Sequence, residues 1–226
     1  MAMLCLFCND GYGQPFEAEA RAFTREQGIP LLVVHSGRRG EALAGRRSPA
    51  SRLKWQLQCF LRSILLSAKE GGPTWLVSDV NARFFSCQLG GQMHGVIAGF
   101  NQIFQPATIN RLASLVNFHP SVLPYYRGPV PSYWCLENKE ERTGYTLHRV
   151  TGEIDRGEPL FQEELAIGSA RTDRDLDLLI AARAASCFRR YLAHLFLGKP
   201  FDRVLLEAGQ IYRVRLDYGS FPPAPR

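Results

Sequence analysis

The chain has 226 residues, of which 46% are hydrophobic and 21% are charged. This balance is typical of a globular protein and excludes a disordered chain, a fibrous repeat and a disulfide-dense miniprotein. No apolar run approaches the ~20 residues of a membrane helix. The first residues have neither the basic region nor the cleavage site of a signal peptide, so we expect a strand there and a cytoplasmic protein.

The formal net charge of +6 is concentrated in one stretch, residues 38–54. One acidic residue, Glu41, is there outnumbered by six basic ones, which are Arg38, Arg39, Arg46, Arg47, Arg52 and Lys54. Two interpretations remain open. The stretch either binds the phosphate of a nucleotide, a sugar nucleotide or RNA, or it forms a solvated basic surface.

Cys5 and Cys8 form the one suggestive cysteine pair among six cysteines. Both lie in an apolar run that reads as a strand, and residues three apart on a strand point to opposite faces. A redox CxxC would instead begin a helix, and no second metal-binding pair accompanies this one. We therefore expect inert thiols and no bound metal.

The first part of the chain alternates between strand and helix patterns. Strands are expected at residues 4–8, 30–35, 75–78, 95–100 and 115–119, and helices at 16–27, 53–69 and, as a short turn, 106–113. This alternation predicts an α/β fold: a Rossmann-like, mostly parallel, twisted sheet with helices on both faces.

The second part changes character, with alternating strands at 144–150 and 160–165. A helix is expected to begin at Thr172, with Asp175 at the capping-box position, and to end at Gly198. Two short strands, 204–206 and 211–216, are expected to follow as a hairpin extension. We predict a core over 1–170 and a packed carboxy-terminal extension over 171–226, whose late strands could pair with a second copy in a homodimer.

Asn117 and His119 stand out on the strand 115–119, because residues two apart project from the same face. Pro120 ends that strand, which places the pair at the carboxyl edge of a parallel sheet, where such folds bind ligands. An amide and an imidazole there can stabilise an oxyanion and carry a proton. The same two residues could also be ordinary surface groups.

A longer pattern decides between these interpretations. The motifs NFHPSVLPYYRG (117–128), TGYTLH (143–148) and IDRG (154–157) follow one another in order. They resemble the folate-dependent formyltransferases, whose pattern is N-x-H-P-S-L-L-P-x-x-R-G, T-G-V-T-x-H and D-T-G. The 36 residues between His119 and Asp155 match the family interval, and AGFNQIFQP (98–106) resembles the strand and loop upstream.

The resemblance implies transfer of a formyl group from 10-formyltetrahydrofolate to a primary amine, without a metal. It assigns catalysis to Asn117, His119 and Asp155: the amide and imidazole stabilise the oxyanion, and the carboxylate orients His119 and takes the amine proton directly or through water. The implied pterin-binding residues are Asn101, Gln102, Ile103, Phe104, Val150, Gly152, Glu153 and Ile154.

The acceptor is predicted from departures from the family pattern. The first loop, residues 9–13, lacks the Gly-Ser-Asn phosphate loop of the glycinamide ribonucleotide enzymes, and the segment after 170 is shorter than the ~100-residue domain of the tRNA enzymes. We therefore expect a small amine, with a nucleotide-linked amino sugar favoured. The candidate acceptor-binding residues are Asn9, Gly11, Tyr12, Arg127, Tyr133 and Trp134, although the last two aromatic residues could equally be core.

Several alternatives stay open. The amine could belong to a hydroxyornithine, a peptide or glycinamide ribonucleotide. A hydrolase that releases formate from formyl-folate could use the same groups, but such hydrolases carry an extra domain for which we expect no room before Leu4. A non-catalytic nucleic-acid-binding module is disfavoured by the complete set of three polar residues, and we expect no nucleic-acid or membrane partner.

Overall fold

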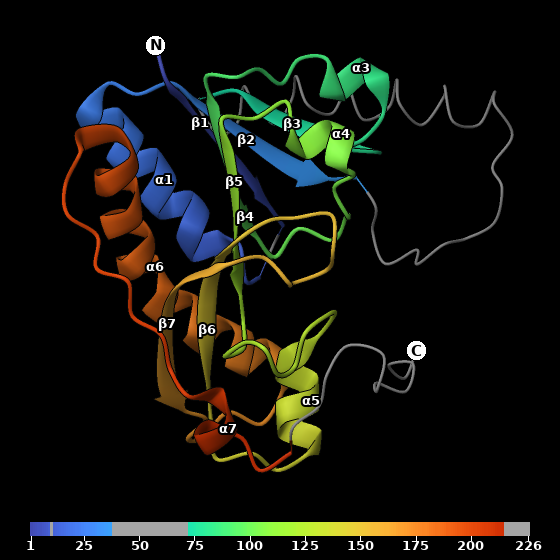
Figure 1. Ribbon diagram of the computed structural model, residues 1–226, viewed down its shortest axis with the longest axis vertical. Coiled ribbons are helices and arrows are strands. Elements are labelled where there is room, and N and C mark those ends of the chain that lie inside the picture. The colour runs from blue at the N-terminus through green and yellow to red at the C-terminus, as the bar shows by residue number, and fades with distance from the viewer. Residues whose placement is uncertain (10, 38–71, 215–226) are drawn as a thin grey trace, which may run out of the picture.

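The computed structural model describes residues 1–9, 11–37 and 72–214. They form one seven-stranded sheet with the order β3-β2-β1-β4-β5-β6-β7 (Figure 1). The strands are β1 (Met3–Cys8), β2 (Leu31–Ser36), β3 (Thr74–Val77), β4 (Met93–Ala98), β5 (Ser114–His119), β6 (Arg142–Arg149) and β7 (Pro159–Ala166). The first five are parallel, and β6 and β7 extend the sheet as antiparallel strands. The predicted mostly parallel α/β fold is confirmed.

Two long helices cover one face of this sheet. The helices α1 (Gln14–Gln27) and α6 (Asp173–Leu197) lie side by side there (Figure 1). Arg189 of α6 joins them, with nitrogen–oxygen distances of 2.5 Å to both Glu19 and Glu26 of α1. As predicted, α6 begins with a capping box between Thr172 and Asp175 and is followed by a left-handed glycine.

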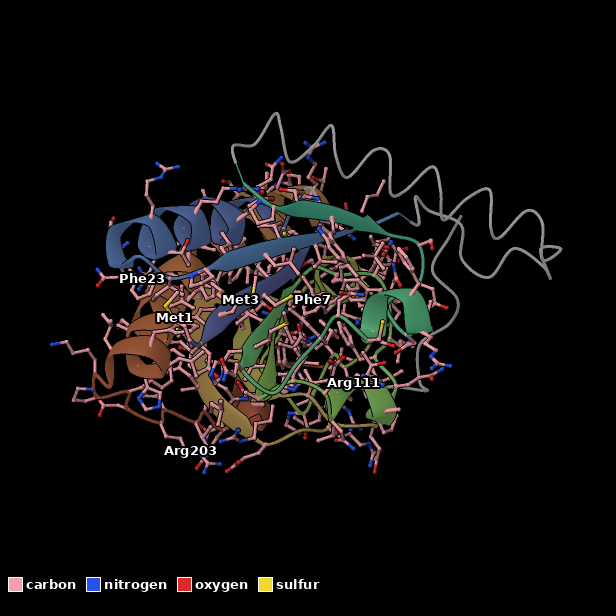
Figure 2. All side chains as sticks on the ribbon, turned by 90° about the horizontal axis from the view of Figure 1, so that it is seen from above. Met1, Met3, Phe7, Phe23, Arg111 and Arg203 are labelled. Carbon is pink, nitrogen blue, oxygen red and sulfur yellow. The ribbon has the colours of Figure 1, made fainter. Side chains whose placement is uncertain are left out.

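The other face carries short elements, α3 (Arg83–Ser86) and α4 (Pro106–Ile109), while α5 (Pro131–Glu137) and α7 (Ala208–Ile211) lie near the antiparallel strands (Figure 1). Residues along β1 alternate between the two apolar cores: Leu4, Leu6 and Cys8 pack toward α1, and Cys5 and Phe7 toward the opposite face. In Figure 2 the labelled Phe23 lies by α1 and Phe7 on the far side of β1. The two thiols of the CxxC therefore diverge, as expected.

Some expectations were wrong. The predicted hairpin at the carboxy-terminal end is not formed by the described residues: Val204 makes a single parallel bridge to Phe161, and Ala208–Ile211 is a helical turn. The reason is burial, because the chain there turns inward to bury Ala208 and Tyr212 instead of continuing along the sheet. The two late strands that we expected to form a homodimer edge are therefore not paired with each other in the described chain, which ends at residue 214. The predicted helix at 53–69 and the basic stretch 38–54 lie outside the described residues.

The helix predicted over 106–113 is a single turn that ends at Ile109. The short helices α3, α5 and α7 were not predicted, since four to seven residues give too little periodicity to recognise. Among the described residues, no helix combines the length and the apolar character needed to cross a membrane.

Candidate active site

A cavity of about 850 Å³ opens at the carboxyl ends of β1, β4 and β5. Its wall includes the end of β5, the turn after β1, the loop after β4 and the segment 150–155 that follows β6. The three predicted catalytic residues Asn117, His119 and Asp155 all line it. The sheet thus places its polar strand ends on one hollow, where open α/β sheets bind their ligands.

The pairing of β5 with β6 sets the positions of the imidazoles. Asn117 lies opposite His148 and His119 opposite Thr146 in this antiparallel pair. Because alternate residues share a face, the side chains of all four project to the same side of the sheet. The rings of His119 and His148 are edge to face, with centroids 6.4 Å apart.

The carboxylate of Asp155 contacts the other polar groups of the site. Its Oδ2 accepts a hydrogen bond from the backbone N–H of Gly128 at 2.9 Å and lies 3.6 Å from Nδ1 of His119. Its Oδ1 lies 3.4 Å from Nδ2 of Asn117 and 3.5 Å from Nε2 of His148. One carboxylate therefore contacts groups from three other places in the chain: the end of β5, Gly128 and the end of β6.

The backbone around Asp155 is constrained. Asp155 has a φ of 49°, in the left-handed region that few residues other than glycine adopt. Two residues later, a Cβ on Gly157 would lie 1.6 Å from the carbonyl oxygen of Arg149. Only glycine fits there, so the turn after β6 can fold back tightly enough to bring Asp155 to the sheet end.

Each ring nitrogen of His119 faces an oxygen atom of the protein. Its Nε2 lies 2.9 Å from the carbonyl oxygen of Tyr126, and because a carbonyl only accepts, that nitrogen must donate its hydrogen. Nδ1 is left facing Asp155. The loop that supplies the carbonyl is held by Ser121, which donates to the Tyr125 carbonyl at 2.9 Å, and by Thr146, which donates to the Ser121 carbonyl at 2.7 Å.

The electrostatics of the pair are coupled. Burial lowers the pKa of His119, although Asp155 and the Tyr126 carbonyl act to raise it. Burial also acts to raise the pKa of Asp155, but His119, His148 and the Gly128 N–H outweigh it and hold that pKa well below its usual range. Asp155 is therefore ionised at neutral pH, and it faces a histidine that can take up one more proton at Nδ1.

His148 is the site residue that our sequence assignment missed. It is buried, its Nδ1 donates to the Arg149 carbonyl oxygen at 2.8 Å, and its Nε2 lies 3.2 Å from Nδ2 of Asn117. The signal was present, because His148 closes the TGYTLH motif. Assigning that motif to a strand antiparallel to 115–119 would have placed it beside Asn117.

The eight predicted pterin-binding residues all line the cavity. They differ in the apolar surface or the hydrogen-bonding groups that they present to the cavity. Ile103 is 66% exposed at the wall, and Phe104 packs edge to face on Phe7 with centroids 4.8 Å apart. The amide of Gln102 is already used inside the protein, since it donates to Ser36 and the Val77 carbonyl and accepts from the Val80 N–H.

The predicted acceptor-binding residues divide into two groups. Asn9, Gly11 and Tyr12 line the cavity, whereas Arg127, Tyr133 and Trp134 do not. Trp134 is buried in the core and Tyr133 packs edge to face against it at 5.0 Å, which is the alternative that the sequence left open. The cavity also has a wall that the sequence did not indicate, at the start of α6: Asp173, Arg174 and Asp177.

The segment that carries the site is similar to known formyltransferases. Residues 93–190 match the formyl transferase family. The chain resembles the folate-dependent formyltransferases. The chain is 36% identical over 105 residues to a methionyl-tRNA formyltransferase of Solibacter usitatus, and 37% identical over 82 residues to a phosphoribosylglycinamide formyltransferase of Escherichia coli. These alignments cover 46% and 36% of this chain and only 33% and 39% of the two relatives.

Solved structures extend the likeness to the whole fold. A sugar N-formyltransferase from Shewanella matches 92% of this chain and 74% of its own, with a TM-score of 0.61 and 21% identity. A glycinamide ribonucleotide transformylase from Symbiobacterium toebii matches 91% of this chain and 95% of its own, with a TM-score of 0.63 and 18% identity. At such identities the match shows the fold and leaves the acceptor open.

Proposed function

We propose that this protein transfers a formyl group from 10-formyltetrahydrofolate to a primary amine of a small metabolite. The observation that carries the proposal is the convergence of Asn117, His119 and Asp155 on one cavity wall, from a strand and a loop 36 residues apart. This grouping offers a hydrogen-bond donor for a carbonyl oxygen and a proton acceptor for an attacking amine, which acyl transfer requires.

The amide of Asn117 is the first oxyanion donor in this proposal. Its contacts to Asp155 at 3.4 Å and His148 at 3.2 Å are long compared with the usual 2.9–3.0 Å of an N–H···O bond. One amide hydrogen can therefore turn to the formyl oxygen at small cost. As negative charge develops on that oxygen, a preformed donor stabilises it without reorganising solvent.

Asp155 and His119 act as a coupled base. The amine proton passes to Asp155, directly or through a water molecule, and on to Nδ1 of His119, 3.6 Å away. The resulting imidazolium then lies beside the oxyanion and stabilises it. As the new carbon–nitrogen bond forms and the bond from the formyl carbon to the donor nitrogen breaks, the same proton returns to that nitrogen.

The donor is assigned to the part of the cavity between residues 101–104 and 150–154. The cavity volume lies in the range of small-molecule sites, and Ile103 and Phe104 offer apolar surface to a flat ring. The backbone of the turn 151–154 offers hydrogen-bonding groups. Related folds support this assignment: one sugar 3N-formyltransferase was solved in the presence of 5-N-formyl-THF, and one N-formyltransferase in complex with folinic acid.

For the acceptor we propose a nucleotide-linked amino sugar. Support comes from solved structures of the same fold: an N-formyltransferase from Helicobacter canadensis is in complex with dTDP-3-aminofucose (TM-score 0.62), and WlaRD is in the presence of dTDP (TM-score 0.59). The start of α6 adds the carboxylates of Asp173 and Asp177, which suit the ammonium form of an arriving amine.

The test is to mix the protein with 10-formyltetrahydrofolate and a panel of amines: dTDP- and UDP-amino sugars, glycinamide ribonucleotide, hydroxyornithine and a short peptide. Mass spectrometry should find one acceptor heavier by a formyl group, and Asn117→Ala should slow its formation by ~10²–10³. Formate release that does not depend on any amine would instead indicate a hydrolase. If no panel member is formylated and no donor is consumed, the proposal is wrong.

A further inference from the structure

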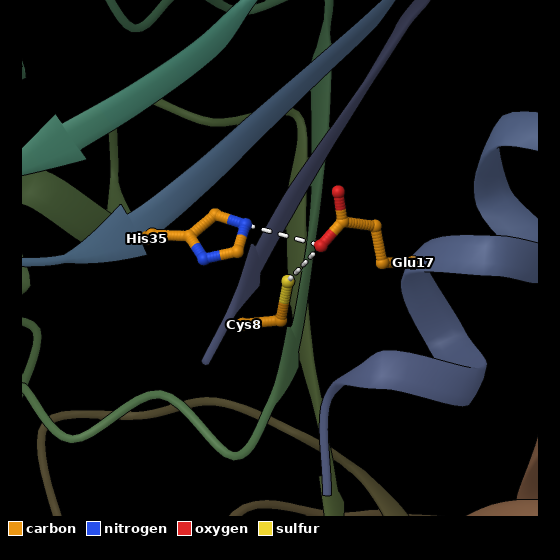
Figure 3. Close-up of side chains that lie close together, drawn as sticks. All are labelled: Cys8, Glu17 and His35. Atoms are coloured by element: carbon orange, nitrogen blue, oxygen red, sulfur yellow. Dashed lines mark hydrogen bonds and ion pairs between the residues drawn. The ribbon is translucent and has the colours of Figure 1, made fainter. Parts of the chain in front are cut away.

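A second group of chemically reactive side chains lies beside the cavity, at the carboxyl ends of β1 and β2. Cys8 and His35 are direct neighbours in the parallel pairing of these strands, so both project toward α1. Glu17, in the first turn of α1, faces them from the helix that packs on this side of the sheet. Figure 3 shows the thiol, the imidazole and the carboxylate pointing toward one another from three separate elements.

The tight turn after β1 makes this approach possible. A Cβ on Gly13 would lie 2.3 Å from the carbonyl oxygen of Asn9 and 2.7 Å from Cβ of Cys8. With glycine there, α1 begins directly over the end of β1. This brings the carboxylate of Glu17 over the buried thiol of Cys8.

We propose that Cys8, Glu17 and His35 form a binding site for a divalent transition metal, best suited to Zn²⁺. The three donor atoms lie within 4.8 Å of one another. Oε2 of Glu17 is 3.8 Å from Sγ of Cys8 and 3.1 Å from Nε2 of His35. Ligand atoms of a tetrahedral zinc ion are about 3.3–3.6 Å apart, as follows from metal–ligand distances of ~2.0–2.3 Å. The two distances to Glu17 need shifts of only a few tenths of an ångström, whereas the distance from Sγ of Cys8 to Nε2 of His35, bounded at 4.8 Å, closes by at most about 1.3 Å.

The chemistry of the three donors fits the same ion. Sulfur, imidazole nitrogen and carboxylate oxygen are the three ligand types that zinc takes in proteins. Burial acts to raise the pKa of Glu17, but hydrogen bonds from His35 and Arg21 outweigh it and lower that pKa to about 2. Glu17 is thus ionised when a cation arrives, whereas the Cys8 thiol must release one proton to solvent on binding.

A second layer of contacts orients the carboxylate. Arg21 donates from Nε and a terminal nitrogen to Oε1 of Glu17, at 2.9 and 2.7 Å, and leaves Oε2 toward Cys8 and His35. Arg21 is in turn held by Thr74 of β3 at 3.0 Å. Such outer partners are typical of metal sites, because they fix the ligand orientation. Exposed fractions of 17% for Glu17 and 21% for His35 leave a path for the ion and room for a water as fourth ligand.

This site is separate from the formyl-transfer groups, and its existence does not depend on the proposed function. This proposal departs from our expectation, based on the cysteine spacing, that the protein binds no metal. That expectation examined cysteine pairs along the chain, while the ligands here come from one cysteine and two residues brought to it by the fold.

The test uses the whole 226-residue chain, treated with a chelator and then titrated with Zn²⁺, and in parallel with Co²⁺. We expect one Zn²⁺ per chain, release of one proton, and a near-ultraviolet thiolate-to-cobalt absorption band. The melting temperature should rise by about 5–10 °C at a Zn²⁺ concentration 100 times the Kd. The cobalt band needs no variant, so it tests the site even if a substitution prevents folding.

Variants then identify the ligands. Cys8→Ala, His35→Gln and Glu17→Gln should each weaken Zn²⁺ binding by ~100-fold or more, since outer partners alone account for ~10–100-fold. Cys5→Ala and His94→Gln, a thiol and an imidazole on neighbouring strands, are the matched controls and should bind as the parent does. The absence of stoichiometric binding, or binding with no thiolate band and no effect of Cys8→Ala, would show that Glu17, His35 and Arg21 form only an ion-pair network.

Discussion

Asn117 carries two amide hydrogens on Nδ2, and its two partners both line the cavity. One direction leads to Oδ1 of Asp155 and the other to Nε2 of His148. The residue is therefore held by partners that also surround the cavity, and it can exchange one of them for the formyl oxygen.

Asn117→Ala should lower kcat by ~10²–10³ while KM for both substrates changes little, because the lost donor acts in the transition state. Steady-state kinetics measure this. Asn110→Ala removes the same amide from an exposed position at the end of α4 and serves as the control. A variant that keeps near-parental turnover would remove Asn117 from the mechanism.

His119 predicts a pH dependence with a definite sign. Burial lowers its pKa below the ordinary value of 6.5, and the proposed base is the unprotonated ring. Activity should thus be constant above pH 6.5, as far as His119 is concerned, and should fall as the pH decreases below that value. The measurement is kcat/KM against pH.

The acceptor amine also titrates, so the experiment is repeated with two acceptors of different basicity. If the fall in kcat/KM at low pH is due to His119, it occurs at the same pH with both acceptors. If the acid limb moves with the pKa of the amine, or lies above pH 6.5, the assignment of His119 as the base is contradicted.

That Asn117, His119 and Asp155 lie together at one cavity could be predicted from the sequence, because linked motifs fix their order and spacing. His148 was overlooked because strand pairing, which no single motif reveals, brings it beside Asn117. The role of Gln102 could not be foreseen either: whether an amide faces a ligand or three internal partners depends on the packing of β2 and β3 against its loop.

At the scale of the elements, the turn between β6 and β7 carries Asp155 and depends on Gly157. Gly157→Ala would place a methyl group against the Arg149 carbonyl oxygen, so the turn must move outward. Since a displacement of about 1 Å can reduce a reaction rate by ~10²-fold, we expect a loss of that order in kcat/KM. Gly91→Ala, where a Cβ meets no atom within 4 Å, is the matched control.

The long elements of this fold could be predicted from their periodicity, and α6 from its caps. The short ones could not, because a four-residue helix such as α3 or α7 is stabilised by its surroundings and not by its own sequence. The expected hairpin failed for the same reason: Val204 and Ile211 have strand-like neighbours, but buried contacts of Ala208 and Tyr212 decide the path.

At the scale of the whole molecule, the carboxy-terminal end of the described chain returns to the loop that supports the site. The hydroxyl oxygen of Tyr212 accepts a hydrogen bond from the backbone N–H of Val122 at 2.7 Å. The carboxylate of Glu140 accepts from the hydroxyl of Tyr126 and from the backbone N–H groups of Arg213 and Val214. Residues 90 apart thus stabilise one another.

Tyr212→Phe should destabilise the protein by ~1–3 kcal/mol, because the buried N–H of Val122 loses its partner. Urea unfolding followed by circular dichroism measures this. Tyr133→Phe, which removes a hydroxyl from the half-buried ring on α5, is the control. Equal stability of the parent and Tyr212→Phe would mean that this contact does not support the loop.

The register of β5 against β6 has a practical consequence for anyone who prepares this protein. A slip of one residue would rotate His148 to the opposite face and bring Leu147 into its place. Spectra that report secondary-structure content would scarcely change, yet turnover would vanish. Specific activity per mole is therefore the sensitive assay of correct refolding, and a low active fraction in a well-ordered preparation would point to mispaired strands.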